Sequence, residues 1–184
     1  MTRVLIPVAD GSEEMETVIV ADTLRRAKWE VVLAGLKEGP ITASRGVKIV
    51  PDTTMARVDP AAFDAIVIPG GAAGVETLRK DERVLSAVRV LRAAGKLVAA
   101  VCAGPLVLQE AGILDGLRVT CHPGVASSLT RATRLEEPVV EDGGIITSQG
   151  PGTSFAFALR IVERFDGRAK GAEIARGMVL QKGP

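Results

Sequence analysis

The sequence predicts a doubly wound α/β fold, in which helices cover both faces of a mostly parallel sheet. Short apolar runs rich in Val, Ile and Ala alternate along the chain with longer segments of helical periodicity. The connections between these segments are short and contain glycine and proline, as in folds built from repeated strand–helix units. The 184 residues have the length of one domain, so we expect a single domain over 1–184.

The first half of the chain is expected to hold three strands and one helix. The strand at 3–9 stops at an Asp-Gly turn, and Ser12 then caps a helix that continues to about residue 28. The next strand, 29–34, is followed by a stretch broken by Gly and Pro, and the third, 64–69, opens into a glycine-rich turn. The apolar side of the helix is expected to be Met15, Val18, Ile19 and Leu24, and the broken stretch has two short β candidates, 41–43 and 47–50.

The second half continues the alternation. A helix at 81–94 precedes the strand 97–101, and Gly104-Pro105 then begins a helix that ends at Gly112. The run 118–120 is expected to be a further strand. The remaining elements are a hairpin of 139–141 and 145–148 around an Asp-Gly-Gly turn, a strongly apolar helix over 153–165 and a short helix over 168–176.

The composition argues against a nucleic acid or a membrane as the partner. Twenty-three Lys and Arg oppose 22 Asp and Glu, and aromatic residues make up only 3% of the chain, so we expect no sequence-specific nucleic-acid binding. No run of about 18 apolar residues predicts a transmembrane helix, and the start of the chain does not have the pattern of a signal peptide. Two cysteines are too few for a secreted disulfide scaffold. We therefore expect a cytoplasmic protein with reduced cysteines.

Cys102 is the residue around which the predicted site is arranged. It is the first residue after the buried strand 97–101, and Gly104-Pro105 forces a turn into a helix directly behind it. Its sulfur should therefore lie close to free backbone N–H groups and the positive end of a helix dipole, which favour a thiolate. The alternative is a small apolar core residue. The position at the end of the run favours the reactive interpretation, with a pKa below the ordinary value of about 8.5.

Two other titratable residues are candidates because they lie at the same edge of the sheet. Glu16 is in the first turns of the helix after the first strand; it either partners Cys102 or belongs to a solvated helix start, and the sequence leaves both open. For Glu13 and Glu14 we favour the solvated interpretation. His122 is the only histidine, so any imidazole base must be this residue, although a lone histidine is more often structural.

The glycine-rich turn after the third strand could bind a substrate oxygen. Backbone N–H groups of Gly70 and Gly71 can approach a substrate closely, as an oxyanion site needs, but the same glycines are also expected in a plain tight turn. No dinucleotide or Walker-type phosphate motif follows a strand, and no paired metal-ligand spacing is present. We therefore expect neither a cofactor nor a metal.

Taken together, these residues resemble the ThiJ/PfpI superfamily and, within it, the deglycase type associated with parkinsonism. The Cys-centred elbow combined with the Glu-Glu-Met-Glu sequence makes the resemblance specific, and it extends over almost the whole chain. The matching segments are Gly-Ser-Glu-Glu-Met-Glu-Thr-Val at 11–18, Leu-Arg-Arg-Ala at 24–27, Ser-Arg at 44–45, Ile-Pro-Gly-Gly at 68–71, Val-Cys-Ala-Gly-Pro at 101–105, His-Pro at 122–123 and Thr-Ser-Gln-Gly-Pro-Gly-Thr-Ser-Phe at 147–155.

The resemblance implies a flavodoxin-like sheet sandwiched by helices, with a cysteine nucleophile elbow. It implies that Cys102 is the nucleophile, Glu16 a protonated carboxyl bonded to its thiolate, and His122 a nearby acid or base. Backbone N–H groups of Gly71 and Ala103 would form the oxyanion site. It also implies a cofactor-free homodimer that acts on a small aldehyde.

The chain departs from the family pattern at a few positions. Ala103 stands where protease-like members carry His, so peptidase activity is disfavoured. Gln149 replaces an Arg of some relatives, Val50 replaces a cysteine, and Cys121 is an addition.

Our leading hypothesis is a glyoxalase or deglycase that attacks methylglyoxal, glyoxal or early glycation adducts through a Cys102 hemithioacetal. The alternatives are an oxidative-stress-sensing chaperone whose Cys102 becomes a sulfinate, and a cysteine amidohydrolase.

Overall fold

The computed structural model describes residues 1–180; the last four residues of the predicted domain 1–184 lie outside the described residues. Its central sheet consists of β1 (Arg3–Val8), β2 (Glu30–Gly35), β5 (Thr53–Thr54), β6 (Ala65–Ile68), β7 (Leu97–Val101), β10 (Val139–Asp142) and β11 (Ile145–Ser148). The strand order is β10-β11-β7-β6-β1-β2-β5. Every neighbouring pair is parallel except the hairpin β10–β11. The predicted α/β fold class, with its mostly parallel sheet, is confirmed.

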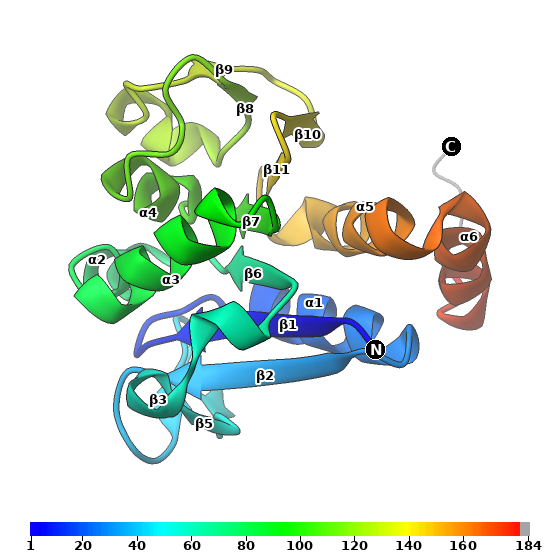
Figure 1. Ribbon diagram of the computed structural model, residues 1–184, viewed down its shortest axis with the longest axis horizontal. Coiled ribbons are helices and arrows are strands. Elements are labelled where there is room, and N and C mark those ends of the chain that lie inside the picture. Colours follow the sequence, from blue (N-terminus) through cyan, green and yellow to red (C-terminus); the bar gives the residue numbers. More distant parts are fainter. Residues whose placement is uncertain (181–184) are drawn as a thin grey trace.

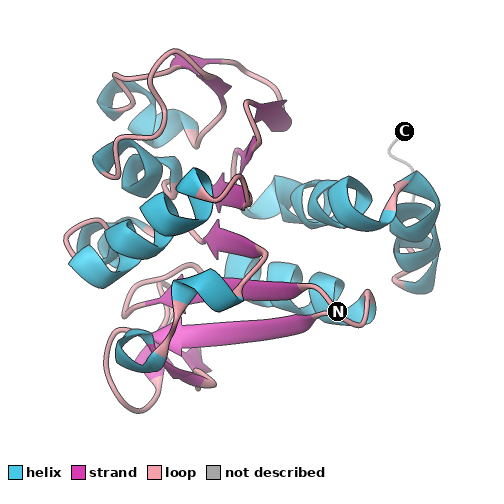
Figure 2. Cartoon of the chain, in the orientation of Figure 1, coloured by secondary structure: helices cyan, strands magenta, loops and turns pink. Residues whose placement is uncertain are grey.

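Helices cover both faces of this sheet (Figures 1 and 2). They are α1 (Glu14–Arg26), α2 (Ala72–Leu78), α3 (Glu82–Ala93), α4 (Pro105–Glu110), α5 (Ser154–Asp166) and α6 (Arg168–Gly177). α1 and α5 pack against each other on one face, and α6 packs against α5. α2, α3 and α4 lie on the other face. The sheet therefore separates two apolar cores.

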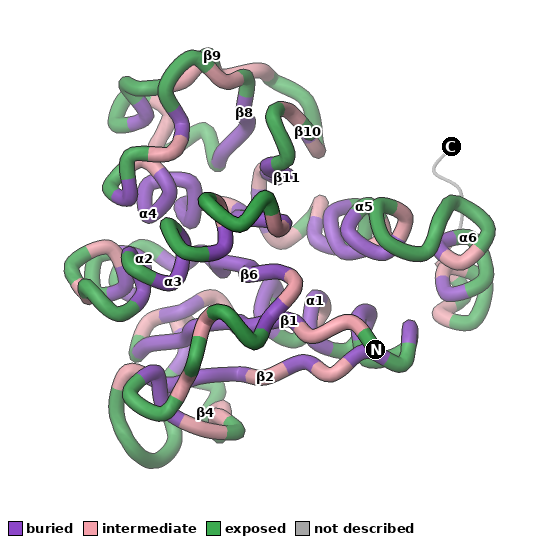
Figure 3. The backbone as a smooth tube through the Cα atoms, viewed as in Figure 1, coloured by how far each residue is buried: buried purple, intermediate pink, exposed green. Residues whose placement is uncertain are grey.

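Strand β7 shows why the central strands are continuously apolar. Val98 and Ala100 face the core under α3 and α4, whereas Ala99 and Val101 face the core under α1 and α5. Because both faces are covered, all five residues of β7 are buried (Figure 3). A strand at the centre of such a sheet holds the segment that follows it at a fixed place, and that segment begins with Cys102.

Helix α1 differs from the prediction in the face that it buries. Its buried side includes Glu14, Glu16 and Thr17, whereas Met15 and Val18 are 54% and 51% exposed. The N-cap is Glu13, whose carboxylate accepts from the Glu16 N–H, and not Ser12. The Ser12 hydroxyl instead accepts from the Ala9 N–H at 3.0 Å, so it closes the turn between β1 and the helix. The predicted apolar side is therefore right for Leu24, which is buried, and wrong for Met15 and Val18.

The prediction also missed α2 and misplaced one strand. The sequence predicts a turn for the glycine-rich segment after β6, yet this segment begins α2. Gly74 of α2 packs so closely that a Cβ would lie 2.5 Å from the Ser12 nitrogen. The run 118–120 does not join the main sheet, because β8 (Arg118–Val119) pairs only with β9 (Thr133–Arg134). The other short elements are the β3 (Ile41–Thr42) and β4 (Lys48–Ile49) hairpin and the 3-10 turns Met55–Arg57, Pro60–Ala62, Pro123–Ser128 and Pro151–Thr153.

Candidate active site

Cys102 lies at a sharp turn between β7 and α4. Its φ is 63°, a left-handed conformation that costs a residue with a side chain about 1–2 kcal/mol. Backbone hydrogen bonds hold it there: the Cys102 N–H donates to the Ser148 carbonyl at 2.9 Å, and its carbonyl accepts from the His122 N–H at 2.9 Å. The neighbouring strand β11 and the segment after β8 therefore both fix the turn. The thiol is consequently presented at the carboxyl end of the sheet.

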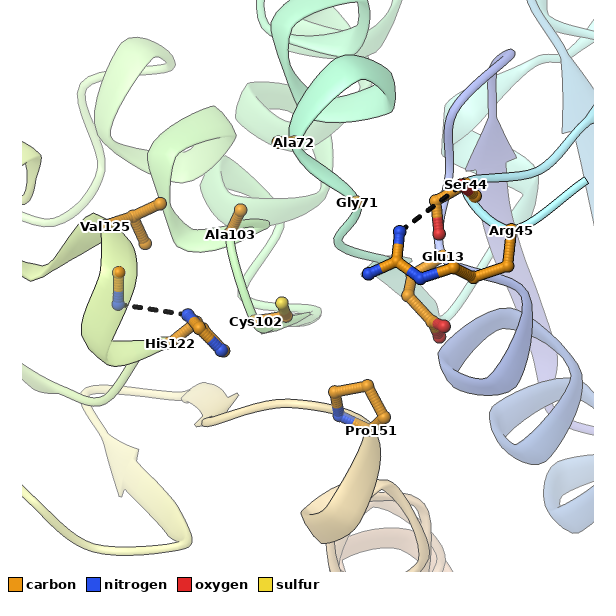
Figure 4. A pocket seen from close by; sticks show the side chains of 11 residues that line it. Glu13, Ser44, Arg45, Gly71, Ala72, Cys102, Ala103, His122, Val125 and Pro151 are labelled. Atoms are coloured by element: carbon orange, nitrogen blue, oxygen red, sulfur yellow. Dashed lines mark hydrogen bonds between the residues drawn. The ribbon is translucent and has the colours of Figure 1, made fainter.

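A cavity of about 380 Å³ opens above this thiol (Figure 4). Its wall comes from segments far apart in the chain, namely the start of α1, the β3–β4 hairpin, the turns after β6 and β7, and the 3-10 turns Pro123–Ser128 and Pro151–Thr153. The lining residues are Glu13, Ser44, Arg45, Gly71, Ala72, Cys102, Ala103, His122, Gly124, Val125 and Pro151. The cavity thus brings together Cys102, His122, Gly71 and Ala103, as the sequence predicted, whereas Glu16 lies behind the thiol.

Glu16 is completely buried, with 0% of its surface exposed. Its Oε2 accepts from the Gly70 N–H at 2.7 Å, whereas among residues 1–180 its Oε1 has no N–H or O–H partner. Burial raises the pKa of this carboxyl to about 7, although hydrogen bonds from the Cys102 thiol and the Gly70 N–H oppose the increase. The solvated interpretation of Glu16 is therefore wrong for this fold.

The Cys102 thiol does not have the low pKa that its position alone predicts. Burial, followed by the charge and hydrogen bond of the Glu16 carboxylate, raises the pKa of Cys102 to about 12. The N–H groups of Gly71 and Ala103 lower it, as expected at such a turn, but by less. Thiol and carboxyl titrate as a pair: burial disfavours the charged form of both, and the negative charge left after the first proton has gone disfavours loss of the second.

The two glycines after β6 have different surroundings. Gly71 has a φ of +87° and lines the cavity, and a Cβ there would lie 2.2 Å from the Gly11 carbonyl oxygen. Gly70 is not among the lining residues, and its N–H already donates to Glu16. Of the three N–H groups expected to bind a substrate oxygen, only those of Gly71 and Ala103 point toward the sulfur.

His122 faces Cys102 across the cavity (Figure 4). It is the N-cap of the 3-10 turn Pro123–Ser128, and its Nδ1 accepts from the Gly124 N–H at 3.0 Å. A nitrogen that accepts a hydrogen bond carries no proton, so the neutral ring carries its proton on Nε2. His122 is therefore oriented as a hydrogen-bond donor toward the cavity.

Sequence reasoning missed the contribution of the β3–β4 hairpin. Glu14, expected to be solvated, is 7% exposed and accepts from the Ser44 hydroxyl at 2.9 Å and the Arg45 N–H at 2.8 Å. These bonds place Arg45 on the cavity wall. The Ser-Arg segment belongs to the family resemblance, but nothing in the sequence indicated that a buried carboxylate holds it.

Comparison with known proteins identifies the family. The sequence matches the DJ-1/PfpI family over residues 2–164. The chain belongs to the DJ-1/PfpI family. This confirms the resemblance inferred from the elbow and the first-helix sequence.

Among residues 1–180, no helix has the length and apolar character needed to cross a bilayer, and no cluster of three or more His, Cys, Asp or Glu is placed to hold a metal ion.

Three relatives illustrate the similarity. The chain is 41% identical over 180 residues to the DJ-1 homolog B of Arabidopsis thaliana, covering 97% of this chain but only 41% of that protein. It is 37% identical over 181 residues to the glutathione-independent glyoxalase DJR-1.2 of Caenorhabditis elegans, covering 97% and 96% of the two chains. The crystal structure of Drosophila melanogaster DJ-1beta superimposes with a TM-score of 0.95 at 38% identity, covering 98% and 99%.

Proposed function

We propose that this member of the DJ-1/PfpI family is a cofactor-independent glyoxalase or deglycase for small α-oxoaldehydes, such as methylglyoxal and glyoxal, or their early glycation adducts. The observation that carries the proposal is the Cys102 thiol at the base of a cavity, paired with a buried carboxyl and flanked by two N–H donors. The similarity to a glutathione-independent glyoxalase supports it. We assign the activity to the cytoplasm, where the two free cysteines stay reduced.

The first step forms a hemithioacetal. Sγ of Cys102 bonds to the aldehyde carbon, and the thiol proton passes to the Glu16 carboxylate, whose raised pKa of about 7 suits it to accept and return a proton near neutral pH. The negative charge that appears on the aldehyde oxygen is stabilised by the N–H groups of Gly71 and Ala103. Glu16 then returns the proton to that oxygen, so the adduct is neutral.

The second step moves hydrogen from the aldehyde carbon to its neighbour. Glu16 is hydrogen-bonded to Sγ, next to the carbon bonded to sulfur, and its carboxylate removes that carbon's proton to give an enediolate. His122 donates from Nε2 to the second carbonyl oxygen and stabilises the charge that develops there. Glu16 protonates the second carbon, and the hydroxyl proton on the sulfur-bearing carbon passes to the neighbouring oxygen, which leaves a thioester with a hydroxyl beside it. Water cleaves the thioester and releases the hydroxy acid and the free thiol.

The test is turnover of methylglyoxal by purified protein without glutathione, followed as lactate formed. We expect Cys102→Ser to abolish turnover and Cys121→Ser, which alters a buried thiol outside the cavity, to retain it. Lactate formation by the wild type no faster than by Cys102→Ser would refute the proposal.

A second candidate function is oxidative sensing, because the same groups suit an oxidised sulfur. A sulfinate on Cys102 would accept from the Gly71 and Ala103 N–H groups. It would also accept from a protonated Glu16, because Oε1 of Glu16, which has no N–H or O–H partner among residues 1–180, would then carry the proton. Graded peroxide followed by a chaperone assay distinguishes the two functions. A sensing role requires that oxidation of Cys102 switches the chaperone activity on.

We also propose that the chain forms a homodimer through the exposed side of α1 and the β3–β4 hairpin. Met15, Val18, Val47 and Val50 are 54%, 51%, 51% and 73% exposed. The Glu14 hydrogen bonds join the two segments, so these apolar side chains lie on neighbouring parts of the surface. Light scattering should give twice the mass of one chain, and Val50→Asp should shift it toward one chain. A wild-type monomer would contradict this proposal.

A further inference from the structure

The guanidinium of Arg45 is a positive charge on the cavity wall that no acidic side chain neutralises. Its only side-chain hydrogen bond within residues 1–180 is to the Ser44 carbonyl, at 3.3 Å, and no carboxylate of that part of the chain lies within ion-pair distance of it. Figure 4 shows the side chain extending from its loop over the cavity, toward Cys102. The charge is therefore available to a ligand.

Glu13 is the acidic residue among those that line the cavity, and its carboxylate already accepts a hydrogen bond from its own helix. Its Oε2 accepts from the Glu16 N–H at 2.7 Å, as the N-cap of α1. The positive end of that helix also offsets the Glu13 charge. The cavity wall thus presents N–H donors near the sulfur and an unpaired cation on the opposite side.

The loop that carries Arg45 is held by a buried group. The carboxylate of Glu14, 7% exposed, accepts from the Ser44 hydroxyl and the Arg45 N–H, and the Ser44 N–H donates to the Ser12 carbonyl at 2.9 Å. A buried carboxylate is stable only when its oxygens accept hydrogen bonds, so it favours this one loop conformation strongly. The backbone of Arg45 is fixed relative to Cys102 before any ligand binds.

The cavity also has room for more than a three-carbon aldehyde. Its volume of about 380 Å³ falls within the range of about 300–1,000 Å³ that larger small-molecule ligands occupy. A substrate whose aldehyde carbon lies at Sγ can therefore extend a further group toward Arg45.

We propose that Arg45 is a specificity-determining residue that binds an anionic group, a carboxylate or a phosphate, on the far end of the aldehyde bound at Cys102, with Glu14 as its positioning residue. This inference rests on the proposed function for the nature of the reacting group. Guanidinium donors match both anions in geometry and charge. Neutral methylglyoxal would use the sulfur and the N–H donors but not Arg45.

The test uses two alkylating agents of nearly equal size, iodoacetate and iodoacetamide, which differ in charge. In both cases Sγ of Cys102 bonds to the methylene carbon, iodide leaves and the thiol proton passes to solvent, so the ratio of the two rates reports how the cavity treats a carboxylate. We expect Arg45→Gln to lower the iodoacetate-to-iodoacetamide ratio about threefold to tenfold, as the loss of one partly screened charge contact does, with the iodoacetamide rate unchanged. Arg45→Lys should keep most of the ratio.

Arg168→Gln is the matched control, because it removes an exposed arginine at the start of α6, away from the cavity and from the proposed dimer interface. It should leave the ratio unchanged, and 0.5 M salt should reduce the wild-type ratio toward that of Arg45→Gln. Protection of Cys102 from iodoacetamide by acetate or by inorganic phosphate, compared at equal concentration, tells which anion is preferred. An Arg45→Gln ratio equal to the wild-type ratio overturns the proposal.

The role of Glu14 is tested by the same ratio. Glu14→Gln, or Ser44→Ala if that variant does not fold, should lower the ratio without changing the iodoacetamide rate, because the loop loses a bond that fixes Arg45. A wild-type ratio in a folded variant overturns the positioning role. Neither rate requires aldehyde turnover. A protein that discriminates the two reagents but leaves methylglyoxal intact would refute the proposed function while supporting the anion subsite.

Discussion

Replacing Glu16 by glutamine should change how the stability of the protein depends on pH. The Glu16 carboxyl is buried, and its pKa rises from the ordinary 4.5 to about 7 chiefly because burial disfavours the carboxylate. Between pH 4.5 and pH 7 the unfolded chain releases this proton while the folded chain keeps it. The stability that the group contributes is thus fully present below pH 4.5 and is lost progressively as pH rises to about 7.

The magnitude follows from the two pKa values. They differ by about 2.5, and each unit corresponds to about 1.36 kcal/mol, so ionisation of Glu16 lowers the free energy of unfolding by about 3 kcal/mol across this range. In a chain of this size, 1 kcal/mol changes the melting temperature by about 2–4 °C. Glutamine keeps the acceptor for the Gly70 N–H but has no proton to lose. As pH rises from 4.5 to 8, the melting temperature of Glu16→Gln should therefore increase by about 6–12 °C relative to that of the wild type.

Urea unfolding of both proteins in reductant, at steps of half a pH unit over this range, measures the difference between their free energies of unfolding. Thermal unfolding of the same samples measures the difference between their melting temperatures. Taking the difference cancels the other carboxylates, which ionise in both proteins. Glu110→Gln, which removes an exposed carboxylate in α4 outside the cavity, is the control. If the difference between wild type and Glu16→Gln stays constant from pH 4.5 to pH 8, the pKa of Glu16 is not raised and its assignment as the proton carrier is wrong.

Three further predictions concern the thiol. Glu16→Gln should speed iodoacetamide labelling of Cys102 at pH 8, because the carboxylate that raises the thiol pKa is gone, yet slow aldehyde turnover; slower labelling would contradict the paired titration. Gly70→Ala should lower the free energy of unfolding in urea by about 1–3 kcal/mol and slow the labelling of Cys102, because the added Cβ would lie 2.5 Å from Cβ of Cys102. Labelling at the wild-type rate would count against this close packing. Graded peroxide should convert Cys102 to the sulfinate and spare Cys121, which is fully buried in the opposite core, as peptide mapping would show. A Cys102–Cys121 disulfide as the main product would disprove this arrangement.

Much of the fold could be predicted because it depends on neighbours in the sequence. The apolar run 97–101 is the strand β7, bounded as predicted, because a strand covered on both faces must be apolar throughout. The turn at Cys102 was predictable for the same local reason, since Gly104-Pro105 directly follows it. Helix α2 could not be predicted in this way. Its Gly74 has a low helix propensity, and glycine is required there because the backbone of Ser12 approaches too closely for a Cβ.

The chemical properties of the site were decided by contacts between distant segments. The sequence by itself determined the family, the fold class and the position of the reactive cysteine at the end of a buried strand. Only the tertiary structure decided that Gly70, 54 residues from Glu16, uses its N–H on that carboxyl, and that Glu14 holds Arg45, 31 residues away, against the cavity. A pKa depends on burial and on neighbouring charge. Both are set by how separate segments pack. The turn at Cys102 alone therefore predicts a low thiol pKa, whereas in the packed site burial and the neighbouring Glu16 raise that pKa.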